Sequence, residues 1–181
     1  MDIRNVSQHT SPTLYEWRGA NPVGMVIHGS GGTDSLRWLQ RKEPDPKKKS
    51  SADFLIRRDG VILRLTPYGN MAYHSGPANW GKYPQVGDNL NRTHWGVELE
   101  MPNDGKTPPT PAQYNALAQL WVYLYKRGLV RVEDTCTHAE CALPFGRKVD
   151  PSPWSWALFT ECVNIALAAV GAKGQVVFRG R

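Results

Sequence analysis

The chain has 181 residues, of which 40% are hydrophobic and 21% are charged. This balance is typical of a globular protein and excludes a disordered chain, and the length fits one domain with a sizeable core. No apolar run is long enough to cross a membrane. The N-terminal stretch up to Trp17 lacks the apolar core and the cleavage site of a secretory signal, so we expect a protein made without one.

The formal net charge is +6 and the isoelectric point is about 9.3, which favours anionic partners such as nucleic acid, acidic lipid or an acidic wall polymer. The basic residues are scattered and no nucleic-acid recognition motif appears, so we do not expect nucleic-acid binding. The densest basic run, residues 47–49, is interpreted as a solvated loop.

The three cysteines do not form a disulfide framework. Cys136 and Cys141 flank His138, but no second cysteine pair exists to complete a structural zinc site. We therefore expect a buried cysteine on a strand and another in a loop.

The first half of the chain predicts short strands separated by turns. Residues 1–20 show little periodicity and are expected to run along the surface. The apolar run 24–28 predicts a buried strand that ends at His28, followed by a glycine-rich break and a short helix through Arg41. Residues 51–58 and 61–65 predict a hairpin around Asp59-Gly60, with both turn residues at positive φ. Residues 71–76 predict an edge segment, and residues 77–92 a polar loop.

The second half predicts two more strands and two long helices. Residues 95–101 predict a strand with Glu98 and Glu100 on one face, where either solvent or a metal-containing cleft would explain them. A helix is expected to begin at Thr110-Pro111 and to end at Gly128. Residues 129–137 predict a strand, and residues 154–170 a last helix before a basic tail, residues 171–181. That helix is expected to bury Trp156, Phe159, Val163, Ile165 and Leu167.

This order of elements predicts an α/β fold in a single domain, with a central mixed sheet flanked by helices. His28 and His138 both stand at strand ends, where such folds commonly build sites. After His138, a loop rich in proline and glycine leads to Lys148 and Asp150. Histidine and carboxylate are good zinc ligands, and a lysine can stabilise negative charge that develops beside a metal. Each residue alone also has a purely structural explanation, a strand-end histidine or a helix N-terminal acid.

Five stretches together resemble the zinc-dependent type 2 N-acetylmuramoyl-L-alanine amidases and peptidoglycan-recognition proteins. These are residues 26–28, 51–65, 73–76, 91–100, and His138 with residues 146–151. The resemblance extends over about residues 21–170 and implies that family's α/β fold, with residues 1–181 forming one zinc amidase domain.

The resemblance also implies a role for several residues. His28, His138 and Asp150 correspond to the ligands of one Zn²⁺, which would leave a coordination position open for water. Glu98 corresponds to the carboxylate that takes up a proton and returns it to the leaving amine, and Lys148 would stabilise the oxyanion.

The substrate cleft is expected to include His74 and Asn91, which match family positions. Trp95, like Trp80, is expected to offer a ring face to a sugar. The chain departs from the family in two places. His94-Trp95 stands where relatives usually have a small hydroxyl residue and an aliphatic one, and Asp53 stands where a histidine or similar residue is frequent.

The expected activity is hydrolysis of the amide between the lactyl group of N-acetylmuramic acid and L-alanine of peptidoglycan. Size, missing signal and basic charge favour a phage endolysin, made in the host bacterial cytoplasm and acting as a monomer on the cell wall. A cytoplasmic amidase that recycles anhydro-muropeptides explains the missing signal equally well. A non-catalytic peptidoglycan-binding module is the third possibility, although such relatives typically lack a zinc ligand.

Overall fold

The computed structural model describes residues 2–45, 49–81 and 89–180. Its centre is a six-stranded sheet in which β4 and β5 pair antiparallel and all other neighbours are parallel. The strand order is β1 (Ile3–Asn5), β5 (Ile62–Arg64), β4 (Phe54–Ile56), β7 (His94–Leu99), β3 (Gly24–Gly29) and β8 (Thr135–Thr137). The predicted α/β fold with a mixed central sheet is thus confirmed.

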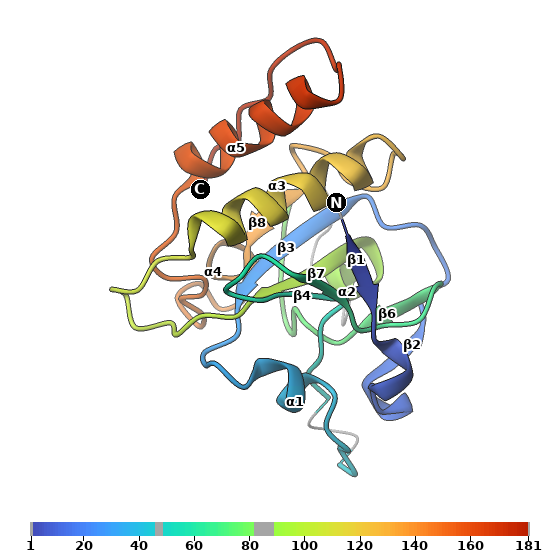
Figure 1. The fold of residues 1–181 in the computed structure, drawn as a ribbon. Helices are drawn as coiled ribbons and strands as arrows, with labels where there is room; N and C mark the ends of the chain where they lie inside the picture. Colours follow the sequence, from blue (N-terminus) through green and yellow to red (C-terminus); the bar gives the residue numbers. More distant parts are fainter. Residues whose placement is uncertain (1, 46–48, 82–88, 181) are drawn as a thin grey trace.

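Two long helices cover one face of this sheet. α3 (Pro111–Tyr125) packs against the strands, and α5 (Trp156–Ala169) packs along α3 (Figure 1). Thr110 caps α3 as predicted: its hydroxyl accepts a hydrogen bond from the N–H of Gln113, whose side chain accepts one from the N–H of Thr110. None of the helices in the described ranges is long and apolar enough to cross a membrane.

The last helix differs from expectation on one side. Phe159, Val163 and Leu167 are buried as predicted, but Ile165 is 62% exposed and borders a surface hollow lined by residues of α3 and α5. The basic tail is also more than a solvated extension. Phe178 is buried and its ring stacks on that of Trp156, at 5.8 Å between centroids.

Shorter elements occupy the remaining surface. They are the 3-10 helices η1 (Ser7–His9) and η2 (Pro12–Leu14), the helices α1 (Ser35–Leu39), α2 (Asn89–Thr93) and α4 (His138–Cys141), and the strands β2 (Tyr15–Trp17) and β6 (Asn70–Ala72). β2 and β6 form a separate antiparallel ribbon. Trp80 is buried among apolar side chains beside β3 and α4, and its indole N–H donates to the carbonyl of Glu133. Trp80 is therefore a core residue and has no open face for a sugar.

The N-terminal residues lie largely on the surface, as expected, and they also add elements to the fold. β1 joins the edge of the main sheet beside β5, and β2 pairs with β6. Three-residue strands are too short to show periodicity, so no pattern in residues 1–20 predicts them.

The hairpin between β4 and β5 is present, but its turn differs from the prediction. Gly60 has φ +84°, whereas no non-glycine residue in the described ranges has positive φ, so Asp59 does not. The N–H of Gly60 donates to the carbonyl of Arg57, and the Asp59 carboxylate accepts from the N–H of Val61. The loop is thus longer than two residues and needs only one left-handed position.

Other boundaries also moved. The strand predicted over residues 129–137 is only β8, and the expected polar loop 77–92 contains α2 near its end, while residues 82–88 lie outside the described ranges. Cys136 is buried on a strand as predicted, but Cys141 ends helix α4 instead of lying in a loop.

Candidate metal centre and active site

Parallel pairing of β3 with β7 and β8 brings the predicted site residues to one edge of the sheet. His28, near the end of β3, is in register with Glu98 of β7, so both side chains point to the same face. His138 directly follows β8 as the first residue of α4. A capping box fixes the entry to this helix, because the N–H and hydroxyl of Thr137 both donate to the carboxylate of Glu140 at 2.8 Å.

His28, His138 and Asp150 converge, although they lie far apart in the sequence. The Oδ2 atom of Asp150 is 3.0 Å from Nδ1 of His138 and 3.5 Å from Nδ1 of His28. Potential ligand atoms of all three residues lie within 4.8 Å of one another, and all three side chains are buried. Two imidazole nitrogens and one carboxylate oxygen form a donor set that suits a catalytic Zn²⁺ site. The structure therefore brings together the three residues that the sequence suggested as ligands.

Hydrogen bonds orient both imidazole rings. Nε2 of His138 lies 3.2 Å from the carbonyl oxygen of Ser75, which can only accept. Nε2 of His28 lies 3.1 Å from Nδ1 of His74, and Nε2 of His74 lies 3.3 Å from the carbonyl oxygen of His94. One tautomer satisfies all three Nε2 contacts: each Nε2 carries the proton, and Nδ1 of His28 and of His138 then faces Asp150 without a proton and is free to bind a metal. His74 therefore contacts a candidate ligand directly, in addition to lining the cleft.

The protonation states of this group suit a cation. Burial, followed by the charge of His138, lowers the pKa of His28 to about 4. Burial alone would raise the pKa of Asp150, but the close contacts with His138 and His28 outweigh it and hold that pKa well below its ordinary value. At neutral pH, His28 is thus neutral and Asp150 ionised, as metal binding requires.

Glu98 lies in surroundings that oppose its charge. Burial, and next the negative charge of Asp150, raise the pKa of Glu98 to about 8, while the positive charge of Lys148 acts in the opposite direction. The Oε2 atom of Glu98 is buried and has no hydrogen-bond partner among the residues that the structure describes. A buried carboxyl of this kind is poised for proton transfer.

Two hollows flank this group. One, of about 510 Å³, is lined by His74, His138, Asn91 and Lys148 among others. Glu98 lines a second hollow of about 480 Å³ together with the loop 30–35. The predicted catalytic and cleft residues thus reach open space on two sides of the candidate metal group.

Asn91 holds the backbone of the cleft in place. Its Oδ1 atom accepts hydrogen bonds from the N–H groups of His74 and Ser75 and from the Ser75 hydroxyl, at 3.0, 2.8 and 2.9 Å. Because Ser75 in turn accepts the contact from His138, Asn91 supports both imidazoles indirectly. Arg147, which the sequence did not single out, adds a second support: its guanidinium donates to the carbonyls of Ser75 and Pro77.

Trp95 is the predicted cleft residue that the structure does not bring to the site. It lies three positions before Glu98 on β7, so the two side chains point to opposite faces of the sheet. The Trp95 ring is buried on the α3 side beside Phe54, and its indole N–H donates to the carbonyl of Leu129. The alternation of side chains along a strand is sufficient to predict that Trp95 and Glu98 lie on opposite faces.

A buried ion pair, which the sequence analysis did not predict, lies next to the backbone of Asn91 and Gly96. The guanidinium of Arg18 is 2.8 Å from the carboxylate of Asp53, and both side chains are almost fully buried. Asp53 also accepts hydrogen bonds from the Thr66 hydroxyl and from the N–H of Gly96. Arg18 donates to the carbonyls of Asn91 and of other residues around the start of β7. The departure at Asp53 thus has a structural reason: this residue neutralises Arg18.

Comparison with known proteins agrees with this arrangement. The profile of the N-acetylmuramoyl-L-alanine amidase family Amidase_2 matches residues 18–153. The chain is 34% identical over 110 residues to 1,6-anhydro-N-acetylmuramyl-L-alanine amidase AmpD of Enterobacter cloacae, a match that covers 60% of this chain and 54% of the relative. A similar match to AmpD of Citrobacter freundii has 33% identity and covers 63% of this chain and 57% of the relative. The matched segment therefore spans little more than half the length of these relatives.

Solved structures show the same fold. A crystal structure of a selenomethionine AmpD derivative has a TM-score of 0.70 at 28% identity, covering 89% of this chain and 94% of the other. Escherichia coli AmiD, in complex with anhydro-N-acetylmuramic acid-L-Ala-D-γ-Glu-L-Lys, has a TM-score of 0.64 at 26% identity. The match covers 81% of this chain and 60% of the AmiD chain. The Clostridium intestinale endolysin LysCS has a TM-score of 0.60 at 21% identity, and the match covers 95% of this chain and 97% of LysCS. At this identity the likeness shows a common fold and nothing more.

Proposed function

Because this chain belongs to the Amidase_2 family of N-acetylmuramoyl-L-alanine amidases, we propose that it is a zinc-dependent amidase. The bond that it cleaves is the amide between the lactyl group of N-acetylmuramic acid and L-alanine. One observation carries this proposal: His28, His138 and Asp150 place their ligand atoms within 4.8 Å of one another, at the end of the strand pair that also carries Glu98.

The residues divide the chemistry as follows. When bound, Zn²⁺ supplies a Lewis acid that polarises the carbonyl and makes water a better nucleophile near neutral pH. A cation beside Asp150 also favours the ionised form of Glu98, which then accepts the proton of the attacking water and returns it to the leaving amine. Lys148 stabilises the negative charge that develops on the former carbonyl oxygen. His74 and Asn91 hold the imidazoles and the cleft backbone in place.

We propose soluble anhydro-muropeptides as the preferred substrate. This choice rests on similarity to AmpD proteins, which are named as 1,6-anhydro-N-acetylmuramyl-L-alanine amidases, and on the resemblance to AmiD in complex with an anhydro-muropeptide. An endolysin that cuts the intact wall is the second candidate. The net charge of +6, which suits an anionic wall, supports it.

Substrate choice is tested by comparing the two forms directly. Zinc-loaded protein is incubated with a soluble 1,6-anhydro-muramoyl tripeptide and with purified sacculi, and the products are identified by mass. We expect release of a peptide with a free L-alanine amino group, faster from the soluble substrate, and loss of activity with EDTA. Faster release from sacculi would favour the endolysin. Activity that persists without metal would contradict the mechanism, and binding without cleavage of either substrate would indicate a recognition module.

A further inference from the structure

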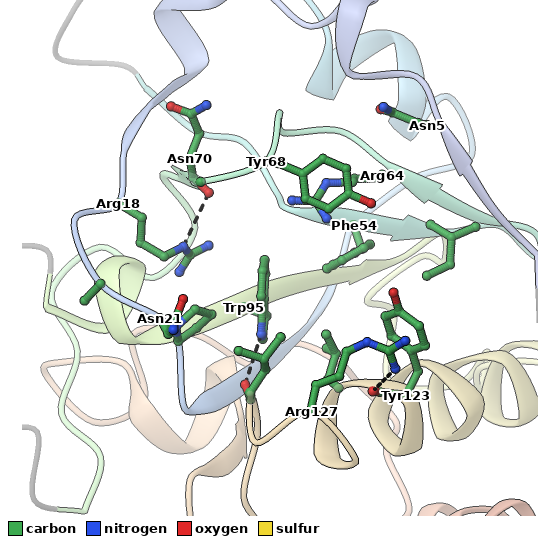
Figure 2. Close-up of a pocket in the computed structure, with 16 residues that line it drawn as sticks. Asn5, Arg18, Asn21, Phe54, Arg64, Tyr68, Asn70, Trp95, Tyr123 and Arg127 are labelled. Atoms are coloured by element: carbon green, nitrogen blue, oxygen red, sulfur yellow. Dashed lines mark hydrogen bonds between the residues drawn. The ribbon is translucent and has the colours of Figure 1, made fainter. Parts of the chain in front are cut away.

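A third hollow lies apart from the candidate metal centre. It has a volume of about 520 Å³ and is situated at the start of β7, where Trp95 forms part of its wall (Figure 2). Glu98 is near the other end of the same strand, on the opposite face of the sheet. This hollow is therefore separate from the proposed amidase chemistry, which makes no use of it.

The lining of this hollow is cationic. Arg18, Arg64 and Arg127 all border it, and none of the described residues that line it is acidic (Figure 2). Arg18 is neutralised by its contact with Asp53. Within the described ranges, neither Arg64 nor Arg127 forms an ion pair. The charge of Asp53 also acts on Arg64, but no carboxylate of the described residues contacts Arg64 or Arg127 directly.

Arg64 is the unusual member of this group. It is only 7% exposed, and the one hydrogen bond of its side chain within the described residues runs from Nε to the carbonyl of Thr66. Its guanidinium stacks on the ring of Tyr68 at 3.8 Å and lies 5.6 Å from the ring centre of Phe54. Burial lowers the pKa of Arg64, because the charged form loses contact with water.

This arrangement leaves an open position for an anion. Aromatic rings stabilise the faces of the Arg64 guanidinium, but the terminal amino groups along its edge have no acceptor among the described residues. An anion in the hollow would supply that acceptor. Carboxylates match the planar guanidinium edge with two parallel hydrogen bonds.

We propose that this hollow binds a carboxylate ligand, held by the guanidinium edge of Arg64. Arg127, which is exposed and stacks on the ring of Tyr123 at 3.6 Å, adds a second positive charge at the rim. Trp95 and the largely exposed Tyr68 provide ring surface for the apolar part of the ligand. The carboxylate belongs either to a free small acid or to the end of a peptide, and the two sources share this recognition chemistry.

The test measures binding by NMR and needs no enzymatic activity. The indole N–H signal of Trp95, assigned with a Trp95→Phe variant, is followed during titration with sodium acetate, with N-acetyl-alanine and with phosphate, at constant ionic strength set by chloride. We expect saturable shifts with the carboxylates. Tighter binding of N-acetyl-alanine than of acetate would identify a peptide end, whereas equal affinities would identify a small acid.

Substitutions decide whether Arg64 holds the ligand. Arg64→Gln should weaken carboxylate binding at least about tenfold, as expected for the loss of a charge-assisted, two-point contact. Arg57→Gln, which removes an exposed arginine outside the hollow, should leave binding unchanged. If Arg64→Gln does not fold, Arg127→Gln replaces it and should weaken binding several-fold. Absent shifts, shifts with phosphate alone, or equal binding in the arginine variants would overturn the proposal.

Discussion

Glu98 shows how one side chain with a buried, unpaired carboxyl oxygen can limit both stability and activity. In the metal-free protein its pKa of about 8 lies far above the ordinary value of 4.5, chiefly because of burial. The folded protein therefore holds a proton that the unfolded chain releases as the pH rises above about 4.5. Stability must fall between these two pKa values, by an amount that grows with pH.

The first prediction concerns this pH dependence. Replacing Glu98 with glutamine removes the titration. The free energy of unfolding of Glu98→Gln, relative to that of the parent protein, should therefore increase from pH 5 to pH 8.5. The expected gain is a few kcal/mol, since each pKa unit corresponds to about 1.4 kcal/mol. Urea unfolding of EDTA-treated proteins at the two pH values measures it. Glu161→Gln, at an exposed position, controls for the loss of one charge. An equal difference at both pH values would show that Glu98 titrates normally.

The second prediction separates the chemistry of Glu98 from its effect on folding. Glu98→Gln should retain one equivalent of zinc but lower kcat by roughly 10²–10⁴-fold, because the carboxylate that moves the proton is missing. Zinc content by metal analysis and steady-state kinetics on the anhydro-muropeptide give the two readouts. A variant with full activity would remove Glu98 from the mechanism.

The candidate ligands were predictable from sequence because they stand in recognisable positions. His28 and His138 follow apolar strand runs, and Asp150 belongs to a recognisable motif. The contact between His74 and His28 was not predictable, since it depends on how β6 and β7 pack together. Trp95 was placed in the cleft by its chemistry, although its position on the strand points it toward α3.

At the scale of elements, close packing of β7 against the cleft backbone sets the position of His74. Gly96 of β7 has no side chain at the point where the His74 ring lies, and a Cβ atom there would overlap that ring. The ring of His74 in turn lies next to His28. A backbone position in the centre of the sheet thus determines how a candidate metal ligand is oriented.

The third prediction uses this contact. Gly96→Ala should push His74 away from His28, lowering zinc affinity and destabilising the fold by about 1–3 kcal/mol, as overpacking typically does. Gly32→Ala is the control, because a Cβ atom there meets nothing within 4 Å. Zinc titration followed by calorimetry, together with urea unfolding, measures both effects. Unchanged zinc affinity in a folded Gly96→Ala protein would show that His74 does not orient His28.

The elements themselves were predictable to different degrees. Helix α3 followed from the Thr110-Pro111 start and the apolar stripe, because local signals specify long helices well. The short strands β1, β2 and β6 did not, because their pairing depends on partners distant in the chain. The ion pair between Arg18 and Asp53 was likewise invisible, since 35 positions separate the two residues.

The fourth prediction concerns this ion pair. Asp53→Asn should destabilise the protein by about 3–5 kcal/mol, because it leaves the buried charge of Arg18 without its counter-ion. Asp59→Asn breaks a contact with Arg57 between two half-exposed side chains and should change stability by less than about 1 kcal/mol. Urea unfolding compares the two variants. Similar small effects would mean that Arg18 is neutralised elsewhere.

At the scale of the whole molecule, the two faces of the sheet have different tasks. The face covered by α3 and α5 holds the largest group of buried apolar side chains. The opposite face carries Glu98 and His28 near the ends of parallel strands. Polar side chains occupy positions there that apolar side chains would otherwise fill. Three buried histidines lie close together there, and this polar centre gains most when a cation enters it.

The fifth prediction follows from that difference. Zinc should raise the melting temperature of the metal-free protein, since a ligand that binds only the folded state contributes about 2.7 kcal/mol at a hundredfold excess over its Kd. Asp150→Asn should abolish most of this rise, because the carboxylate shared by His28 and His138 loses its charge. Asp59→Asn, a matched change at a half-exposed turn, should retain it. Scanning calorimetry with and without zinc provides the comparison. An equal rise in Asp150→Asn would place the zinc elsewhere and separate the three converging side chains from the proposed hydrolysis.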